Sequence, residues 1–105
     1  MANRQEKIQE ALRIAAAEFL AREANRQSLV TVTRTLMSED GKRGTIYITA
    51  FPESAENAAV KFANRHRTEF ADFFRKKVRG AFPPHVEFVI DLGEKNRQRL
   101  DEISE

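Results

Sequence analysis

The stretch from Ser54 to Asp91 constrains the fold of this chain more than any other part of the sequence. It has the sequence SAENAAVKFANRHRTEFADFFRKKVRGAFPPHVEFVID and contains six of the eight phenylalanines and both histidines. Apolar residues first recur at helical spacing, then Gly80 and two prolines follow, and the last residues alternate between apolar and polar. This pattern predicts a long helical segment, a loop and a strand.

The helical segment does not keep a single apolar face. Its apolar residues are Ala59, Phe62, Ala63, Phe70, Phe73, Phe74 and Val78. At about 100° per residue, the apolar side drifts by roughly 45° between the first half and the second. Such a drift fits either one bent helix or two helices with a break between Arg65 and Thr68. At a break, the Thr68 hydroxyl could bond to freed backbone N–H groups and cap the second helix.

The rest of the chain adds a helix and two strands. Residues 4–24 carry apolar side chains at helical spacing and predict an amphipathic helix. Residues 28–38 are rich in β-branched side chains and predict a strand. We expect Val30, Val32 and Leu36 on one face of it and Thr31, Thr33 and Thr35 on the other.

The turn sequence EDGKRG and a second strand, TIYITAF, then predict an antiparallel hairpin. In the final strand, Val86, Phe88 and Ile90 point inward. One three-stranded sheet with helices on one side would bury all of these faces, which makes the fold α+β. We expect residues 1–92 to form one domain and residues 93–105 a polar tail or short helix.

Composition limits the classes of function. The chain has 105 residues, no cysteine and a charged content of 32%, which fits one soluble domain without disulfides or thiolate metal sites. No run approaches the roughly 20 apolar residues of a membrane helix, and the N-terminus lacks the apolar core of a signal peptide. We therefore expect a cytoplasmic protein with no membrane contact.

Positive charge is concentrated in one part of the chain. Between Lys61 and Gly80, seven Lys or Arg oppose two acids, so this segment carries +5 and the rest −3 of a net +2. A localised basic surface suits an anionic partner, although helices also carry exposed lysines and arginines without binding anything.

The residue patterns of catalysis and cofactor binding are missing. The four glycines are scattered, no serine lies in a nucleophile elbow, and no carboxylate pair has a distinctive setting. His85 and Glu87 share a strand face but lack further metal ligands. The phenylalanines have core spacing, and we interpret them as core residues rather than base-stacking platforms. We therefore expect no enzyme, no cofactor, no metal and no small-molecule substrate.

With these segments placed, the chain resembles the ribosome-binding factor A family of bacterial small-subunit assembly factors. The first matching stretch is VTVTRTLMSEDGKRGTIYITAF, where the family has a Ser-x-Asp turn and a hydrophobic-Tyr-hydrophobic strand; here these are Ser38, Asp40 and residues 46–48. The second is PHVEFVID, which matches a Pro-x-hydrophobic-x-Phe-x-x-Asp strand. The basic start, NRQEKIQEAL, and the order of elements also match.

The resemblance implies a type II KH-like domain with a mixed three-stranded sheet, in the order α-β-β-α-(kink)-α-β. Where nucleic-acid-binding KH domains have a Gly-x-x-Gly loop, the family has a helix–kink–helix, usually with a small-x-Gly sequence. Aligned from PHVEFVID, the kink falls on His66, Arg67 and Thr68, and this chain has no glycine there.

The resemblance also implies a function: binding of the immature small (30S) ribosomal subunit and its 16S rRNA precursor during late maturation, by a protein that is a monomer. Basic residues would neutralise RNA phosphates. The candidates are Arg4, Lys7, Lys42, Arg43, Arg65, Arg67, Arg75, Lys76, Lys77 and Arg79. The alternative is a protein-interaction module on the same scaffold without an RNA role.

Overall fold

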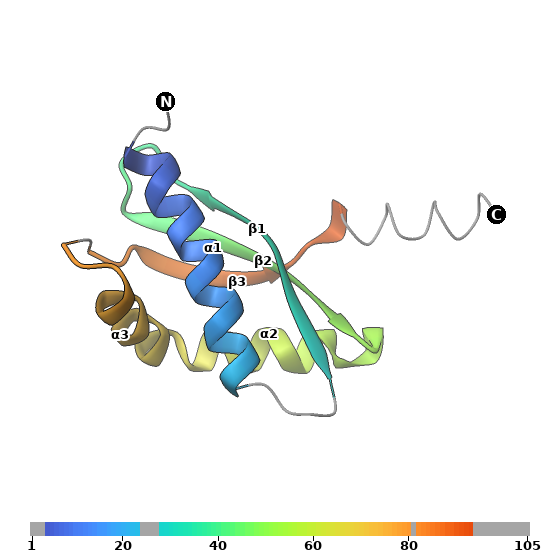
Figure 1. Cartoon of the computed structure of the whole chain (residues 1–105). Coiled ribbons are helices and arrows are strands. Elements are labelled where there is room, and N and C mark those ends of the chain that lie inside the picture. The colour runs from blue at the N-terminus through green and yellow to red at the C-terminus, as the bar shows by residue number, and fades with distance from the viewer. Residues whose placement is uncertain (1–3, 24–27, 81, 94–105) are drawn as a thin grey trace.

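The computed structural model describes residues 4–23, 28–80 and 82–93, and it has the predicted order of elements (Figure 1). The elements are α1 (Arg4–Glu23), β1 (Leu29–Met37), β2 (Arg43–Phe51), the short 3-10 helix η1 (Glu53–Ala55), α2 (Glu56–Arg65), α3 (Arg67–Lys77) and β3 (His85–Ile90). From residue 94 onward, the predicted tail lies outside the described residues.

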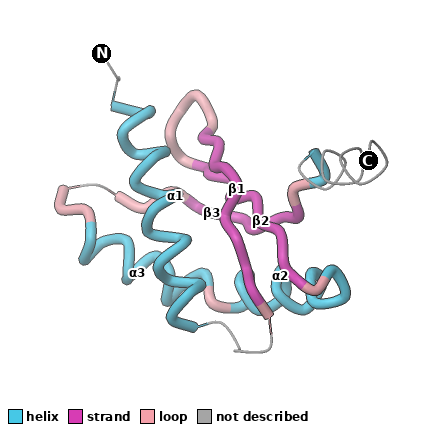
Figure 2. Tube along the Cα trace, turned by 45° about the vertical axis from the view of Figure 1, so that its right-hand side comes forward, coloured by secondary structure: helices cyan, strands magenta, loops and turns pink. Residues whose placement is uncertain are grey.

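The three strands form the predicted mixed sheet. β2 lies in the centre, antiparallel to β1 and parallel to β3. A tight hairpin joins β1 to β2, whereas the parallel pair needs a longer crossover, which α2 and α3 supply. All three helices cover one face of the sheet and leave the other open (Figures 1 and 2). The α+β, KH-like arrangement is therefore confirmed.

The core lies between the sheet and the helices. Six large side chains are fully buried there: Leu12, Ile46, Ile48, Phe70, Phe74 and Phe88. The Phe70 ring packs edge-on against Phe19 of α1 at 5.6 Å between centroids and against Phe88 of β3 at 5.8 Å. Phe70 therefore joins α1, α3 and β3 in one aromatic cluster, a geometry that adds to the stabilisation from burial alone.

A β-bulge at Thr33 makes the predicted facing of β1 wrong in its second half. Val32 pairs with Ile48, and Arg34 pairs with Tyr47, which is adjacent to Ile48 on β2. Thr33 is therefore an extra residue on β1. An extra residue reverses the alternation of faces beyond it. Thr35 is consequently buried under α1, and Leu36, which was expected inside, is 44% exposed.

Residues at and beyond the bulge make polar contacts on both faces of the sheet. On the helical face, the Thr35 hydroxyl donates to the Gln9 carbonyl at 2.7 Å, and the Met37 N–H donates to Gln9 Oε1 at 3.2 Å. On the open face, Arg34 lies 3.5 Å from Asp91 Oδ2 and stacks on the Tyr47 ring at 4.0 Å. These contacts fasten β1 to α1 on one side and to the end of β3 on the other.

The long helical segment is two helices, with the break at His66. This residue has φ −104° and ψ 25°, and its N–H is shared between the carbonyls of Phe62 and Ala63. No side chain caps either helix at the break. The expectation that Thr68 caps the second helix is wrong, because Thr68 lies within α3. The break instead allows each helix to turn its own apolar stripe toward the core.

Asn64, in the last turn of α2, attaches this helix to β3. Its Nδ2 donates to the Phe88 carbonyl at 2.9 Å, and its Oδ1 accepts from the Phe88 N–H at 2.9 Å. The side-chain amide thus pairs with the strand backbone as a neighbouring strand would. Helical periodicity gives no indication of this contact.

Ser38 and Asp40 organise the hairpin loop. The Ser38 hydroxyl donates to Asp40 Oδ1 at 2.6 Å and accepts the Arg43 N–H at 3.1 Å, while the Lys42 N–H donates to Asp40 Oδ1 at 3.0 Å. The Ser38 hydroxyl and then the Lys42 N–H lower the pKa of Asp40, because both stabilise its charged form. Gly41 takes the positive φ, 73°, that the loop requires.

We predict that Asn64→Ala destabilises the protein. The change leaves a backbone N–H and C=O of β3 without partners in a partly buried place, which costs about 2 kcal/mol. Urea unfolding measures the loss, and Asn57→Ala, at an exposed position of the same helix, is the matched control. Equal stability of the two variants would contradict the role of the Asn64 amide.

We predict that the hairpin loop loses its order only in acid. The pKa of Asp40 is lower in the folded protein than its ordinary 3.8, so its stabilising contribution is full above that pH and is lost as the pH falls through the folded value. The amide shifts of Lys42 and Arg43, followed by NMR, should titrate with a midpoint below 3.8. This titration should vanish in Asp40→Asn and persist in Glu39→Gln.

Candidate nucleic-acid interface

The ten predicted RNA-binding residues are all exposed, but they come from separate parts of the fold. Arg4 and Lys7 lie in the first turns of α1, and Lys42 and Arg43 lie at the end of the hairpin loop and the start of β2. Arg65 and Arg67 flank the break at His66. The remaining four lie in the last turn of α3 and just beyond it.

Four of these cations gather at one end of the molecule, which we call the hairpin end: Arg4, Lys7, Lys42 and Arg43. Gln5 Nε2 donates to the Glu39 carbonyl at 2.5 Å, which holds the start of α1 against the hairpin loop. The His85 N–H donates to the Lys42 carbonyl at 2.8 Å, which holds the start of β3 there as well. Residues far apart in sequence are thereby presented together.

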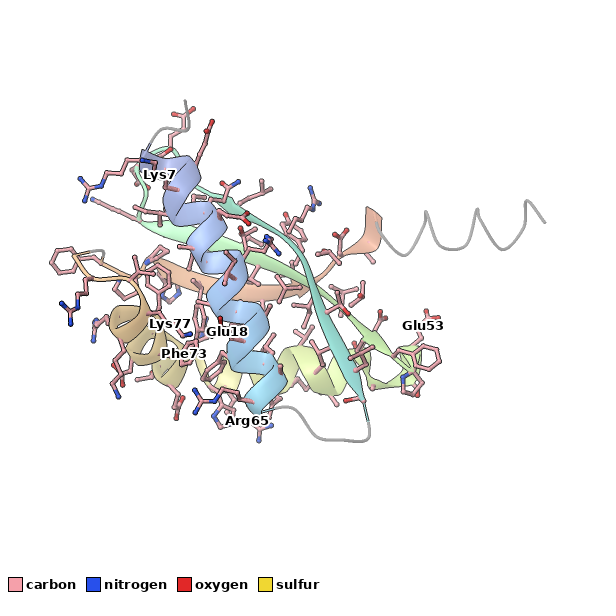
Figure 3. The ribbon with its side chains drawn as sticks, viewed as in Figure 1. Lys7, Glu18, Glu53, Arg65, Phe73 and Lys77 are labelled. Carbon is pink, nitrogen blue, oxygen red and sulfur yellow. The ribbon has the colours of Figure 1, made fainter. Side chains whose placement is uncertain are left out.

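Arg65 lies away from the hairpin end. In Figure 3, Lys7 and Arg65 are seen at opposite ends of α1. The predicted residues therefore do not form one compact patch. They form a basic group at the hairpin end, a basic group at the helix break, and the end of α3 between them.

Ion pairs divide the predicted cations into two kinds. Arg75 Nη1 lies 3.3 Å from Asp72 Oδ1 within α3. Lys77 pairs with Glu18 of α1 and lies 5.6 Å from the centre of the Phe73 ring, so it links two helices (Figure 3). Within residues 4–23, 28–80 and 82–93, the other eight form no ion pair. No close carboxylate in these ranges occupies the end of any of the eight side chains.

The basic end of α3 also has a structural explanation. Arg75, Lys76 and Lys77 occupy its last turn, where cations interact favourably with the negative end of the helix dipole. Arg75 and Lys77 also form ion pairs. Stabilisation of the helices therefore explains the presence of these cations without a bound partner. At the hairpin end, Asp40 attracts Lys42 and Arg43, but the helix dipole does not favour Arg4 and Lys7, which lie at the N-terminal end of α1.

Two phenylalanines contradict the interpretation of all aromatic residues as core. Phe51 is 75% exposed and Phe82 is 91% exposed. Phe51 ends β2, and Phe82 lies in the loop after α3, so neither belongs to the periodic patterns of its neighbours. The position of Phe82 between a helix-ending glycine and two prolines was the signal that could have set it apart.

An open depression of about 360 Å³ lies between α1 and α3. Its lining consists of Phe19, Arg22, Glu69, Asp72, Phe73 and Lys76. The lining combines charged side chains of both signs with two phenylalanine rings. These lining residues include no nucleophile next to a general base. In the part of the chain that the structure describes, no three His, Asp or Glu side chains come together as metal ligands, and no helix could cross a bilayer.

Solved structures of known proteins share this fold. The crystal structure of ribosome-binding factor A from Thermus thermophilus matches with a TM-score of 0.71 and 24% identity, over 84% of this chain and 97% of that one. A Thermus thermophilus homology model fitted into a cryo-EM map of a 30S–ribosome-binding factor A complex matches with a TM-score of 0.66 and 25% identity, over 86% and 93%.

The solution NMR structure of a putative ribosome-binding factor A from Thermotoga maritima matches with a TM-score of 0.60 and 25% identity, over 85% of this chain and 84% of that one. A search of curated protein sequences finds no significant match. The resemblance seen in the sequence motifs is nevertheless confirmed, because the family model of ribosome-binding factor A matches residues 4–104. This chain belongs to the ribosome-binding factor A family.

Proposed function

We propose that this protein is a non-catalytic assembly factor that binds the immature small ribosomal subunit and its 16S rRNA precursor and supports late maturation and rRNA processing. The observation that carries the proposal is family membership together with the relative fitted into a 30S complex, which is 25% identical over 86% of this chain. Eight exposed cations that form no ion pair with any described residue supply a physical basis for binding a polyanion.

The mode of binding follows from where these cations lie. Cations at the hairpin end and at the helix break would contact phosphates on different parts of a folded RNA, so binding would depend on RNA shape. Each neutralised phosphate releases counterions, so affinity would fall as salt rises. Residues 1–92 would act as one binding domain, a monomer in the cytoplasm, with no cofactor or small-molecule substrate.

We predict that Lys42→Gln with Arg43→Gln weakens binding to small subunits. The change removes two free cations from the hairpin end, so the slope of log affinity against log salt should become shallower by roughly 1.4 to 1.8. Sedimentation of tagged protein with small subunits across a salt series measures the slope.

The matched control is Arg13→Gln with Arg75→Gln, which removes the same charge from residues paired with Glu10 and Asp72. A smaller change is expected, because these guanidinium groups already have partners. Equal slopes for the two double variants would contradict the division into free and paired cations. Unchanged sedimentation of the Lys42–Arg43 variant at low salt would contradict phosphate contact at the hairpin end.

We predict that Arg65→Gln with Arg67→Gln also weakens binding, because these residues flank the break that stands where KH domains contact nucleic acid. Binding of purified 16S rRNA fragments by a filter assay would show whether the loss is in RNA affinity. Lost sedimentation with unchanged RNA affinity would favour the protein-interaction alternative.

A further inference from the structure

Phe82 is the most exposed large apolar side chain in the described part of the chain, at 91%. Four other phenylalanines, Phe19, Phe70, Phe74 and Phe88, are at least 95% buried. A single exposed apolar residue needs no explanation by itself. Phe82 differs because it stands directly before an anchored Pro-Pro-His segment and because cations lie on the neighbouring segments.

The loop around Phe82 is anchored at its C-terminal side. Pro84 is buried, and its Cγ lies within 3.5 Å of the place where a side chain on Gly44 would begin. The next residue, His85, donates its N–H to the Lys42 carbonyl at 2.8 Å. Two consecutive prolines restrict the backbone after Phe82. On the other side, Gly80 has φ 79°, which turns the chain away from α3.

Positive side chains lie on the segments next to Phe82. Arg79 precedes Phe82 by three residues, and Lys42 and Arg43 are held beside the start of β3 by the His85 contact. All three are exposed, and within the described ranges none of them forms an ion pair. The Asp40 carboxylate of the hairpin loop accepts from the Ser38 hydroxyl and the Lys42 N–H and attracts Lys42 and Arg43, so it offsets part of this positive charge. The charge that remains, that of Arg79 included, attracts anions to this end of the molecule.

We propose that Phe82 stacks on an unpaired base of the bound RNA while Lys42, Arg43 and Arg79 contact the adjoining phosphates. This rests on the proposed function, and it adds that the protein selects a site where a base is free. Aromatic rings stack on any base that is not paired, and cations beside them hold the backbone. The two prolines that follow Phe82 restrict the backbone there, which lowers the cost of ordering this segment on binding.

Two RNAs that share the same duplex test this inference, with the whole chain as the protein. One is a duplex with a single bulged 2-aminopurine, and the other is the same duplex without the bulge. Phe82→Ala and Phe82→Leu should each weaken binding of the bulged RNA by about tenfold and leave binding of the duplex unchanged. Phe82→Trp should restore the affinity, because it keeps the stacking surface.

The fluorescence of 2-aminopurine reports stacking directly, and it should be quenched by the wild type and by Phe82→Trp but not by Phe82→Ala. Leu29→Ala, which removes a 67% exposed apolar side chain at the far end of β1, should bind both RNAs as the wild type does. This control separates stacking from a general loss of exposed apolar surface.

Three results would overturn the inference, and they have different consequences for the proposed function. If the wild type binds both RNAs and Phe82→Ala binds them equally well, Phe82 does not stack, and the proposed function stands. If the wild type binds neither RNA, both the inference and the RNA part of the proposed function are wrong. If Phe82→Ala lowers only sedimentation with small subunits, Phe82 contacts a protein instead.

Discussion

The structure depends on the aromatic cluster around Phe70. This one ring touches Phe19 of α1, Phe74 of its own helix and Phe88 of β3, so it joins the N-terminal helix, the crossover and the edge of the sheet. Truncating a buried phenylalanine typically costs roughly 3–5 kcal/mol, a large part of the 5–15 kcal/mol that stabilises a small domain. The break at His66 serves this cluster, because α3 must turn independently of α2 to place Phe70 and Phe74 inward.

Because the buried core supplies most of the stability, the surface charges are not required for folding. Exposed ion pairs contribute little to stability, and the pairs within single helices, such as Arg75 with Asp72, fall in that class. Eight of the predicted cations form no ion pair within the described ranges, and four of these lie together at the hairpin end. Their arrangement fits the proposed contact with RNA phosphates.

The sequence predicts the order of elements, the hairpin and most of the core, because periodicity and turn residues report on those local features. It fails where one residue changes the geometry without changing the composition. The bulge at Thr33 is invisible in a run of alternating threonines and valines, yet it exchanges the places of Thr35 and Leu36. The pairing of Lys77 with Glu18 joins residues distant in the sequence, and no local pattern reports such a contact.

Side-chain amides at the two edge strands of the sheet affect how readily the protein aggregates at high concentration. The Asn64 amide occupies the N–H and C=O of Phe88 on the side of β3 away from β2, and Gln9 occupies the N–H of Met37 near the end of β1. A strand from another molecule would need those same groups to extend the sheet. Both borders are thus partly closed to strand addition, which protects a small protein with a three-stranded sheet against aggregation.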